Sequence, residues 1–221
     1  MGTLIVLEGI DGSGKSTQFE LLCRRLQSEG RSFKRLVFPR YDSESSALIR
    51  MYLGGQFGAD PSSVNAYAAS TFFSVDRYAS YVTEWKDYYL NGGLLLSDRY
   101  TTSNAIHQGS KLQGEDRKDF LNWLYQFEFD LLGLPRPDAV IYLDVPSQVS
   151  VEHIKRRSLE TGAKADIHEQ SAGYLEESRR CGLEAAGHYG WKVVDCAPDG
   201  VMRSIEDIGN EIYKYVEGVL L

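Results

Sequence analysis

Cysteine is scarce in this sequence, and long apolar runs are missing. The three cysteines, Cys23, Cys181 and Cys196, lie far apart, without the paired spacing of a zinc site or the density of a disulfide scaffold. No stretch of 18 apolar residues occurs, and the first apolar run, "LIVL", ends at Glu8, too early for a signal peptide. A myristoylation signal would need Ser or Thr where Val6 stands. We therefore expect reduced thiols, no membrane association and a cytoplasmic protein.

Positive charge is also in deficit. The 24 Lys and Arg residues are outnumbered by 31 Asp and Glu residues, which gives a net charge of -7. This balance argues against a protein that binds the nucleic acid backbone, so we expect small phosphate-bearing partners. The 221 residues contain no repeat or low-complexity tract. This length predicts a single domain over residues 1–221.

Five short apolar runs, each bounded by turn signals, are separated by stretches long enough for helices. This pattern predicts an α/β fold of three layers, in which about five parallel strands are covered by helices on both faces. The expected strands are 4–8 (LIVLE), 33–38 (FKRLVF), 93–98 (GLLLSD), 139–145 (AVIYLDV) and 191–196 (WKVVDC).

Helical periodicity is clearest in three segments. Residues 16–30 form an amphipathic pattern that ends at a glycine, 64–90 form a longer aromatic-rich one, and 204–220 close the chain. Residues 156–171, in contrast, are polar and poorly periodic, which predicts a short lid.

The segment "GIDGSGKS", residues 9–16, matches the phosphate-binding pattern G-x-x-x-x-G-K-[ST] between a predicted strand and a predicted helix. Glycines let successive N–H groups turn inward, and the helix N-terminus favours an anion. Lys15 would reach the β- and γ-phosphates, and Ser16 would join a Mg²⁺ shell. A glycine-rich packing turn would not need Lys-Ser at these offsets. We predict ATP with Mg²⁺, bound by Gly9, Gly12, Ser13, Gly14, Lys15, Ser16 and Thr17.

Two features point to a transferase. The guanine-binding N-K-x-D motif of GTPases is missing, since the nearest match is "AKAD" at 163–166. Asp98-Arg99 at a strand end supplies an acid for the metal and a cation for phosphate. Arg40 follows another strand, where a hydroxyl acceptor would be served by a carboxylate base. A phosphate acceptor is favoured, although Asp42 and Glu44 leave a hydroxyl acceptor open.

Candidate residues for binding a base follow. Phe73 and Arg77 are four residues apart on a predicted helix, so a ring can stack on a base while the guanidinium contacts a carbonyl at its edge. Such a pair is also common without any ligand. Ser103, Asn104 and Gln108 lie in "TTSNAIHQG", interpreted as a loop, and offer hydroxyl and amide contacts.

These motifs together resemble one family. "EGIDGSGKST", "FPR", "FFSVDRY", "DRYTTSNAIHQG" and "YLDV" occur in the order and spacing of the thymidylate kinases, over nearly the whole chain. The resemblance implies transfer of the ATP γ-phosphoryl group to dTMP, giving dTDP and ADP, usually by a homodimer. It also implies that Asp11 faces the acceptor's 3′-hydroxyl, that Phe73 stacks on thymine and that Arg77 lies at its carbonyl edge.

The remaining matches concern the phosphates and the metal. Arg99 matches an arginine that bridges the donor and acceptor phosphates, and Asp98 an acid that orders Mg²⁺ through water. Asn104 and Gln108 match polar positions near the base. His107 stands where the family often has an aromatic residue beside the sugar. Acceptors such as dUMP and other monophosphates stay open alternatives, as do a nucleotide-hydrolysing switch and an inactive nucleotide-binding module.

The lid departs from the family. Some members carry an arginine in the phosphate loop, where this chain has Gly12, and others carry basic residues in the lid. Arg156, Arg157 and Lys164 favour the second arrangement, with the two arginines on ATP. The family's acid-Arg-x-Glu or acid-x-Tyr-Glu pattern reads "DIHE" at 166–169 here.

Overall fold

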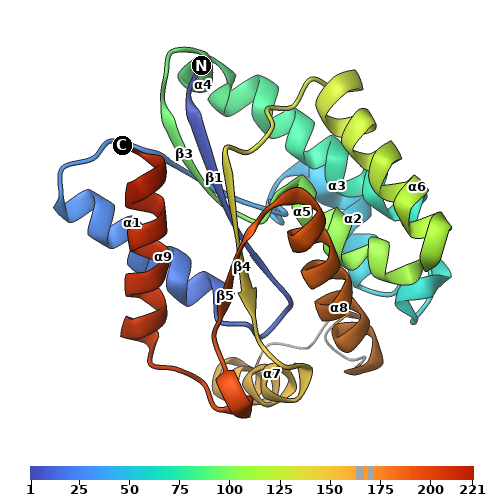
Figure 1. Ribbon diagram of the computed structural model, residues 1–221. Helices are drawn as coiled ribbons and strands as arrows, with labels where there is room; N and C mark the ends of the chain where they lie inside the picture. Colours follow the sequence, from blue (N-terminus) through green and yellow to red (C-terminus); the bar gives the residue numbers. More distant parts are fainter. Residues whose placement is uncertain (163–166, 169–171) are drawn as a thin grey trace.

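A computed structural model describes residues 1–162, 167–168 and 172–221 (Figure 1). Its five strands are all parallel, in the order β2-β3-β1-β4-β5. The predicted parallel sheet and all five predicted strands are confirmed. The strands are β1 (Thr3–Gly9), β2 (Lys34–Val37), β3 (Leu94–Asp98), β4 (Ala139–Asp144) and β5 (Lys192–Asp195).

Alternation along the central strand divides the core into two. Ile5 and Leu7 of β1 face α1 (Lys15–Ser28) and α9 (Ile205–Val219). Leu4 and Val6 face the other side, where α3 (Ala66–Ser80), α5 (Thr101–His107), α6 (Gly114–Tyr125) and α8 (Ala172–Tyr189) lie (Figure 1). The predicted three layers follow from this period-two pattern.

The three predicted helical segments are confirmed. The segment 16–30 corresponds to α1, and 204–220 corresponds to α9. The segment 64–90 is one helical path, in which α3 is followed by a π-helical turn, η3 (Tyr81–Trp85), and α4 (Lys86–Leu90). The other elements are η1 (Glu44–Ser46), α2 (Ala47–Leu53), η2 (Pro61–Ser63), η4 (Gly109–Lys111), η5 (Gln126–Leu131), α7 (Ser147–Thr161) and η6 (Pro198–Gly200).

Two predictions were wrong. The segment "TTSNAIHQG" is helix α5 rather than a loop, because its side chains are almost all buried and bonded. The first part of the predicted lid, 156–161, is the end of α7, which stops at Gly162 with φ +69°. A polar surface helix lacks a strong apolar period, which is why sequence alone did not show it.

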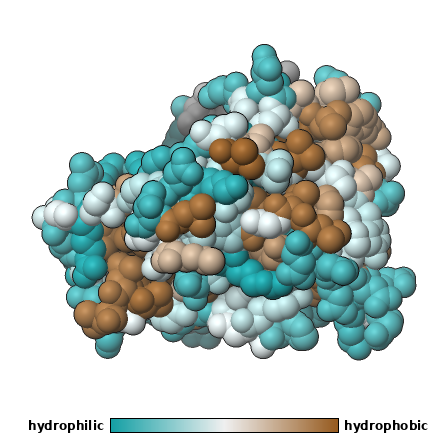
Figure 2. Space-filling view, turned by 90° about the horizontal axis from the view of Figure 1, so that it is seen from above, coloured by the Kyte–Doolittle hydropathy of each residue, from teal (hydrophilic) through white to brown (hydrophobic). Residues whose placement is uncertain are grey.

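The carboxyl ends of the strands lie together at one edge, at the bottom of Figure 1. There the glycine-rich loop leaves β1, Pro39 follows β2 and Arg99 follows β3. Ligands of open α/β sheets bind at this edge. Figure 2 looks down on the opposite edge, where hydrophobic clusters alternate with hydrophilic residues. No helix among the described residues is long and apolar enough to cross a membrane.

Candidate functional site

The glycine-rich loop has the backbone that its sequence predicts. Gly12 and Gly14 have φ of +77° and +81°, in the left-handed region that favours glycine. A Cβ on Gly12 would lie 2.4 Å from the carbonyl oxygen of Ser150 in α7. Gly9 instead packs the turn itself, since its Cβ would lie 2.7 Å from Ser13 Oγ. Glycine is therefore required for geometry at each position.

This loop lines one side of a pocket. Ser16 Oγ donates to Asp98 Oδ2 at 3.2 Å, so the two predicted metal ligands lie together. Lys15 is 6% exposed, and burial, with the nearby Arg99 charge, lowers its pKa. Because a buried cation without a full set of anions is costly, this pocket favours an anionic ligand. Its lining includes the loop residues 11–17, Asp98, Arg99, Arg156 and Arg157.

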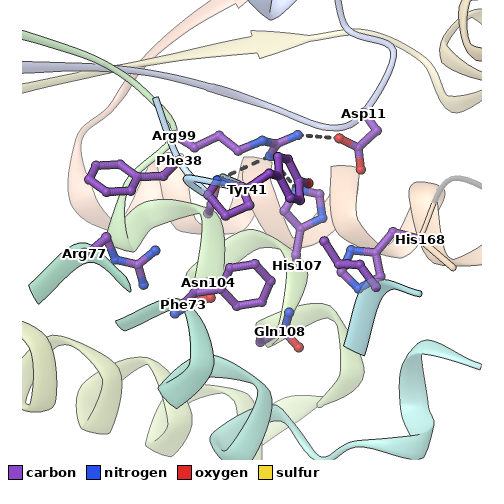
Figure 3. Close-up of a pocket in the computed structure, with 13 residues that line it drawn as sticks. Asp11, Phe38, Tyr41, Phe73, Arg77, Arg99, Asn104, His107, Gln108 and His168 are labelled. Carbon is purple, nitrogen blue, oxygen red and sulfur yellow. Dashed lines mark hydrogen bonds and ion pairs between the residues drawn. The ribbon is translucent and has the colours of Figure 1, made fainter. Parts of the chain in front are cut away.

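Arg99 lies where this pocket, which we call the donor pocket because ATP is predicted to bind the glycine-rich loop, meets a second one. Its φ is +68°, and the turn is held by its N–H, which donates to Leu7 O at 3.1 Å, and by Ser97 Oγ, which donates to Arg99 O at 2.6 Å. The guanidinium forms an ion pair with Asp11 and donates from Nη1 to Ser103 Oγ at 3.3 Å (Figure 3).

Charge explains the protonation of this ion pair. Burial by itself would raise the pKa of Asp11, but Arg99 outweighs it and holds the pKa below its usual range. Burial would likewise lower the pKa of Arg99, yet the carboxylates of Asp11, Glu8 and Asp98 raise it. Both groups are therefore charged at neutral pH.

Glu8 binds the residues that directly follow Arg99. It is fully buried at the end of β1 and accepts hydrogen bonds from Tyr100 N (3.1 Å), Thr102 Oγ1 (2.7 Å) and Ser103 Oγ (2.8 Å). Burial raises its pKa, against the attraction of Arg99. These bonds fix the start of α5, directly after Arg99.

The second pocket contains most of the predicted acceptor residues (Figure 3). Phe73 and Arg77 come from α3, and Ser103, Asn104 and His107 come from the neighbouring helix α5, whose Asn104 bonds to the backbone of α3. Asp11, Phe38, Pro39, Tyr41 and Arg99 line both pockets, so the two are continuous. The lining comprises Asp11, Phe38, Pro39, Tyr41, Leu53, Phe73, Arg77, Arg99, Ser103, Asn104, His107, Gln108 and His168.

The far end of this pocket is organised by a buried carboxylate. Arg77 donates from Nε to Glu128 Oε2 at 2.8 Å, and Asn104 donates from Nδ2 to Glu128 Oε1 at 3.1 Å and to Ser70 O at 3.2 Å. Arg77 is 2% exposed and Glu128 is fully buried. The polar groups at this end are thus held in fixed directions before any ligand binds.

Two histidines lie between the ends. The rings of His107 and His168 stack with centroids 5.8 Å apart. Burial lowers the pKa of His107 well below its usual value and that of His168 to about 3, so both are neutral. Arginine can only donate, so the 3.0 Å contact from Arg99 to His107 Nε2 places the histidine's proton on Nδ1. Ligand atoms of Asp11, His107 and His168 lie within 4.8 Å of one another, but Arg99 already bonds two of the three.

Arg40 is the exception among the predicted acceptor residues. Its backbone N–H and Nε donate to Asp76 at 2.9 and 3.2 Å, its Nη2 donates to Ser45 Oγ at 3.0 Å, and it also pairs with Glu84. It lies outside the lining of both pockets. Its position after β2 is as predicted, but neighbouring carboxylates turn the side chain away from the acceptor.

The lid residues are only partly described. Arg156 and Arg157 lie on α7 beside the donor pocket, and Arg156 is solvent-exposed, 4.0 Å from Glu160. Lys164, Asp166 and Glu169 lie outside the described residues. Of the "DIHE" segment, Ile167 is buried in a small apolar cluster and His168 lines the second pocket.

Sequence reasoning missed several lining and supporting residues. Glu8 and Glu128 were not predicted, although each is an acid inside an apolar segment, "LIVLEGI" and "YQFEF". A charge in such a run signals a buried, bonded group. Tyr41 and Phe38 carried no signal beyond their proximity to a strand end.

Comparison with known proteins supports this arrangement. A family model described as thymidylate kinase matches residues 7–212. Thymidylate kinase of Mycobacterium tuberculosis (strain ATCC 25618 / H37Rv) is 33% identical over 190 residues, covering 85% of this chain and 87% of that protein. Thymidylate kinase of Homo sapiens is 30% identical over 214 residues, covering 96% and 88%. The solved structure of thymidylate kinase from Candida albicans shares the fold, with a TM-score of 0.72 and 24% identity over 98% of this chain and 92% of that one.

Proposed function

The chain belongs to the thymidylate kinase family and phosphorylates dTMP to dTDP, and we propose that ATP and dTMP meet end to end at Arg99. The observation that carries this proposal is the shared lining of the two pockets, with Asp11 and Arg99 on both. ATP occupies the pocket of the glycine-rich loop. The acceptor occupies the other pocket, with its phosphate toward Arg99 and its base toward Phe73.

Alignment and charge neutralisation account for the reaction. Lys15 binds the β- and γ-phosphates, while Arg99 exchanges its bond to Asp11 for the phosphate oxygens between donor and acceptor. Asp11 is then free to accept a hydrogen bond from the 3′-hydroxyl of the acceptor's sugar. Arg156 and Arg157 contribute further positive charge from the donor side.

Mg²⁺ fits the residues present. Ser16 and Asp98 would hold it, because a hydroxyl and a carboxylate lie 3.2 Å apart beside the phosphate loop, and oxygen ligands suit this ion. When bound, it supplies charge neutralisation on the β- and γ-phosphates.

Turnover with a panel of acceptors tests the proposal. ADP release coupled to a reporter reaction is measured with dTMP, dUMP, dCMP and free thymidine. We expect dTMP to be the best acceptor and Lys15→Ala to lose on the order of 10²-fold or more in rate while remaining folded. If free thymidine outperforms dTMP, or if ATP hydrolysis is independent of any acceptor, the assignment is wrong.

We also propose a homodimer formed through α3, in a cytoplasmic setting. Tyr67, Val75 and Tyr78 fall on one side of α3 and are 39%, 55% and 44% exposed, an apolar stripe that supports self-association. Unpaired buried cysteines, such as Cys181, suit a reducing compartment. Light scattering on the wild type and on Val75→Glu measures the mass. A monomeric wild type contradicts the dimer.

A further inference from the structure

Glu128 is fully buried behind Arg77 and Asn104, at the end of the acceptor pocket where we place the base, and it does not itself line the pocket. We propose that Glu128 determines which base the pocket accepts, because it fixes the directions in which Arg77 donates and Asn104 accepts. The inference rests on the proposed function, in which this pocket holds the nucleoside monophosphate.

The carboxylate of Glu128 is saturated by donors from two helices. Oε1 accepts from Ser74 Oγ (2.8 Å), Arg77 Nη2 (2.5 Å) and Asn104 Nδ2 (3.1 Å), and Oε2 accepts from Arg77 Nε (2.8 Å) and Thr101 Oγ1 (2.6 Å). A carboxylate has about four lone-pair sites, so these five contacts leave it no acceptor capacity toward a ligand, even though Ser74 Oγ shares its one hydrogen with Ser70 O. Its effect on the base must therefore act through its neighbours.

The two neighbours are left with one polarity each. Arg77 donates to Glu128 from Nε and from one of the two N–H bonds of Nη2, and within the described part of the chain its Nη1 has no hydrogen-bond partner. Asn104 donates both N–H bonds of its amide, one to Glu128 and one to Ser70 O, so Oδ1 remains as an acceptor. Both residues line the pocket (Figure 3). At this end the pocket lining thus includes a residue that can only donate, Arg77, and an amide whose remaining polar atom, Asn104 Oδ1, can only accept.

A base with a carbonyl next to a ring N–H complements this pair. Thymine and uracil have such an edge, in O4 and N3–H. Cytosine has the reverse, an amino donor and an unprotonated N3, so a donor would face Arg77 and an acceptor would face Asn104. Because unmatched buried polar groups are costly, a site of this kind rejects the wrong edge strongly. Phe73 stacks on either base and cannot make this distinction.

Glu128→Gln tests the inference while keeping the shape of the side chain. The amide brings two N–H donors into a cluster of donors, so Arg77 loses its fork and Asn104 is free to turn its amide over. We expect the ratio of kcat/KM for dTMP to that for dCMP to fall on the order of 10²-fold. The ratio of dTMP to dUMP should stay unchanged, because those two bases share the same edge.

Asp76→Asn is the matched control. Like Glu128, which lies in η5, Asp76 on α3 is a fully buried carboxylate that accepts hydrogen bonds from an arginine, Arg40. It lies outside the pocket lining. We expect a similar loss of thermal stability but an unchanged dTMP to dCMP ratio. A double-mutant cycle adds Arg77→Met. If Glu128 acts through Arg77, the double variant discriminates no worse than Arg77→Met alone.

Two outcomes would contradict this inference. Equal losses on dTMP, dUMP and dCMP in Glu128→Gln would make Glu128 a purely structural residue. If that variant does not fold, Glu128→Asp keeps the charge but moves it by one methylene, and a wild-type base ratio there is equally decisive. Failure of the proposed function is a separate outcome, because wild-type protein would then not turn over dTMP at all.

Discussion

Glu8 and Glu128 are both fully buried carboxylates beside the acceptor pocket, one at the phosphate end and one at the base end, and they are bonded in different ways. Glu128 pairs directly with a guanidinium, that of Arg77. Among the described residues, Glu8 accepts from neutral donors alone, the backbone of Tyr100 and two hydroxyl groups. The cation at its end, Arg99, is instead paired with Asp11, which lines the pocket.

This difference matches what we propose that each end binds. A base edge is neutral, so it is recognised by direction, and Arg77 can have its charge compensated permanently by Glu128. A phosphate is anionic, so it is recognised by charge, and Arg99 must be able to exchange its carboxylate for the ligand. The phosphate end is therefore expected to set the rate and the base end to set the selectivity.

Removal of the exchangeable cation should break the phosphate end. We expect Arg99→Ala to lower kcat by about 10²- to 10³-fold, with the preference for dTMP over dCMP retained. The coupled ADP assay measures both. Arg136→Ala is the control, because Arg136 is exposed, forms a surface ion pair with Asp130 and lies over the Phe129 ring, outside the lining of both pockets. Near-wild-type turnover in Arg99→Ala would contradict the role of Arg99.

Removal of the stacking ring should weaken the base end without changing its selectivity. Phe73→Ala is expected to raise KM for every nucleotide acceptor by about 10- to 10²-fold, because stacking contributes about 1–3 kcal/mol per base. kcat should change less than KM. A large change in the dTMP to dCMP ratio would show that the ring, rather than the Glu128 cluster, reads the base.

Glu8→Gln sharpens the comparison from the other side. An amide can still accept from Tyr100 N and Thr102, so the turn around Arg99 should loosen only slightly. We expect a threefold to roughly tenfold loss in kcat and an unchanged base ratio, since one weakened bond costs about 1 kcal/mol. A changed base ratio would mean that the two carboxylates are not independent.

Lower pH should destabilise the fold through the two buried histidines that lie between the ends of the pocket. His107 and His168 have folded-state pKa values below their unfolded value of about 6.5, with His168 at about 3. Between these values the unfolded chain binds more protons, so the free energy of unfolding falls as the pH drops from about 6.5 toward 3, by up to about 1.4 kcal/mol per pH unit per histidine.

Urea unfolding at several pH values measures this slope. His168→Asn should make the decline less steep, although Asp11 opposes part of the effect by favouring the charged histidine. His188→Asn is the control at an exposed position and should leave the slope unchanged. An identical slope in wild type and His168→Asn would show that this histidine does not contribute.

The sequence predicted the sheet and the place of the glycine-rich loop well because both depend on local patterns. Each strand is a continuous apolar run, and the phosphate loop needs glycines, Lys15 and Ser16 at fixed offsets in one turn. Helix α5 was missed because its helical character comes from burial and from polar neighbours, and the end of α7 was missed because a polar surface helix lacks a strong apolar period. Arg40 was assigned to the acceptor from its place after a strand, and only the position of Asp76 shows otherwise.

By itself, the sequence determined that this chain has a parallel α/β sheet, a phosphate loop and the motifs of its family, since each of these is written in neighbouring residues. Only the tertiary structure decided how Arg77 and Arg99 are used. Their partners, Glu128 and Asp11, are 51 and 88 positions away along the chain. A guanidinium has the same charge in any sequence. The carboxylate that the fold places beside it, fully buried Glu128 for Arg77 and partly exposed Asp11 for Arg99, is the basis of our proposal that Arg77 reads a base and Arg99 binds a phosphate.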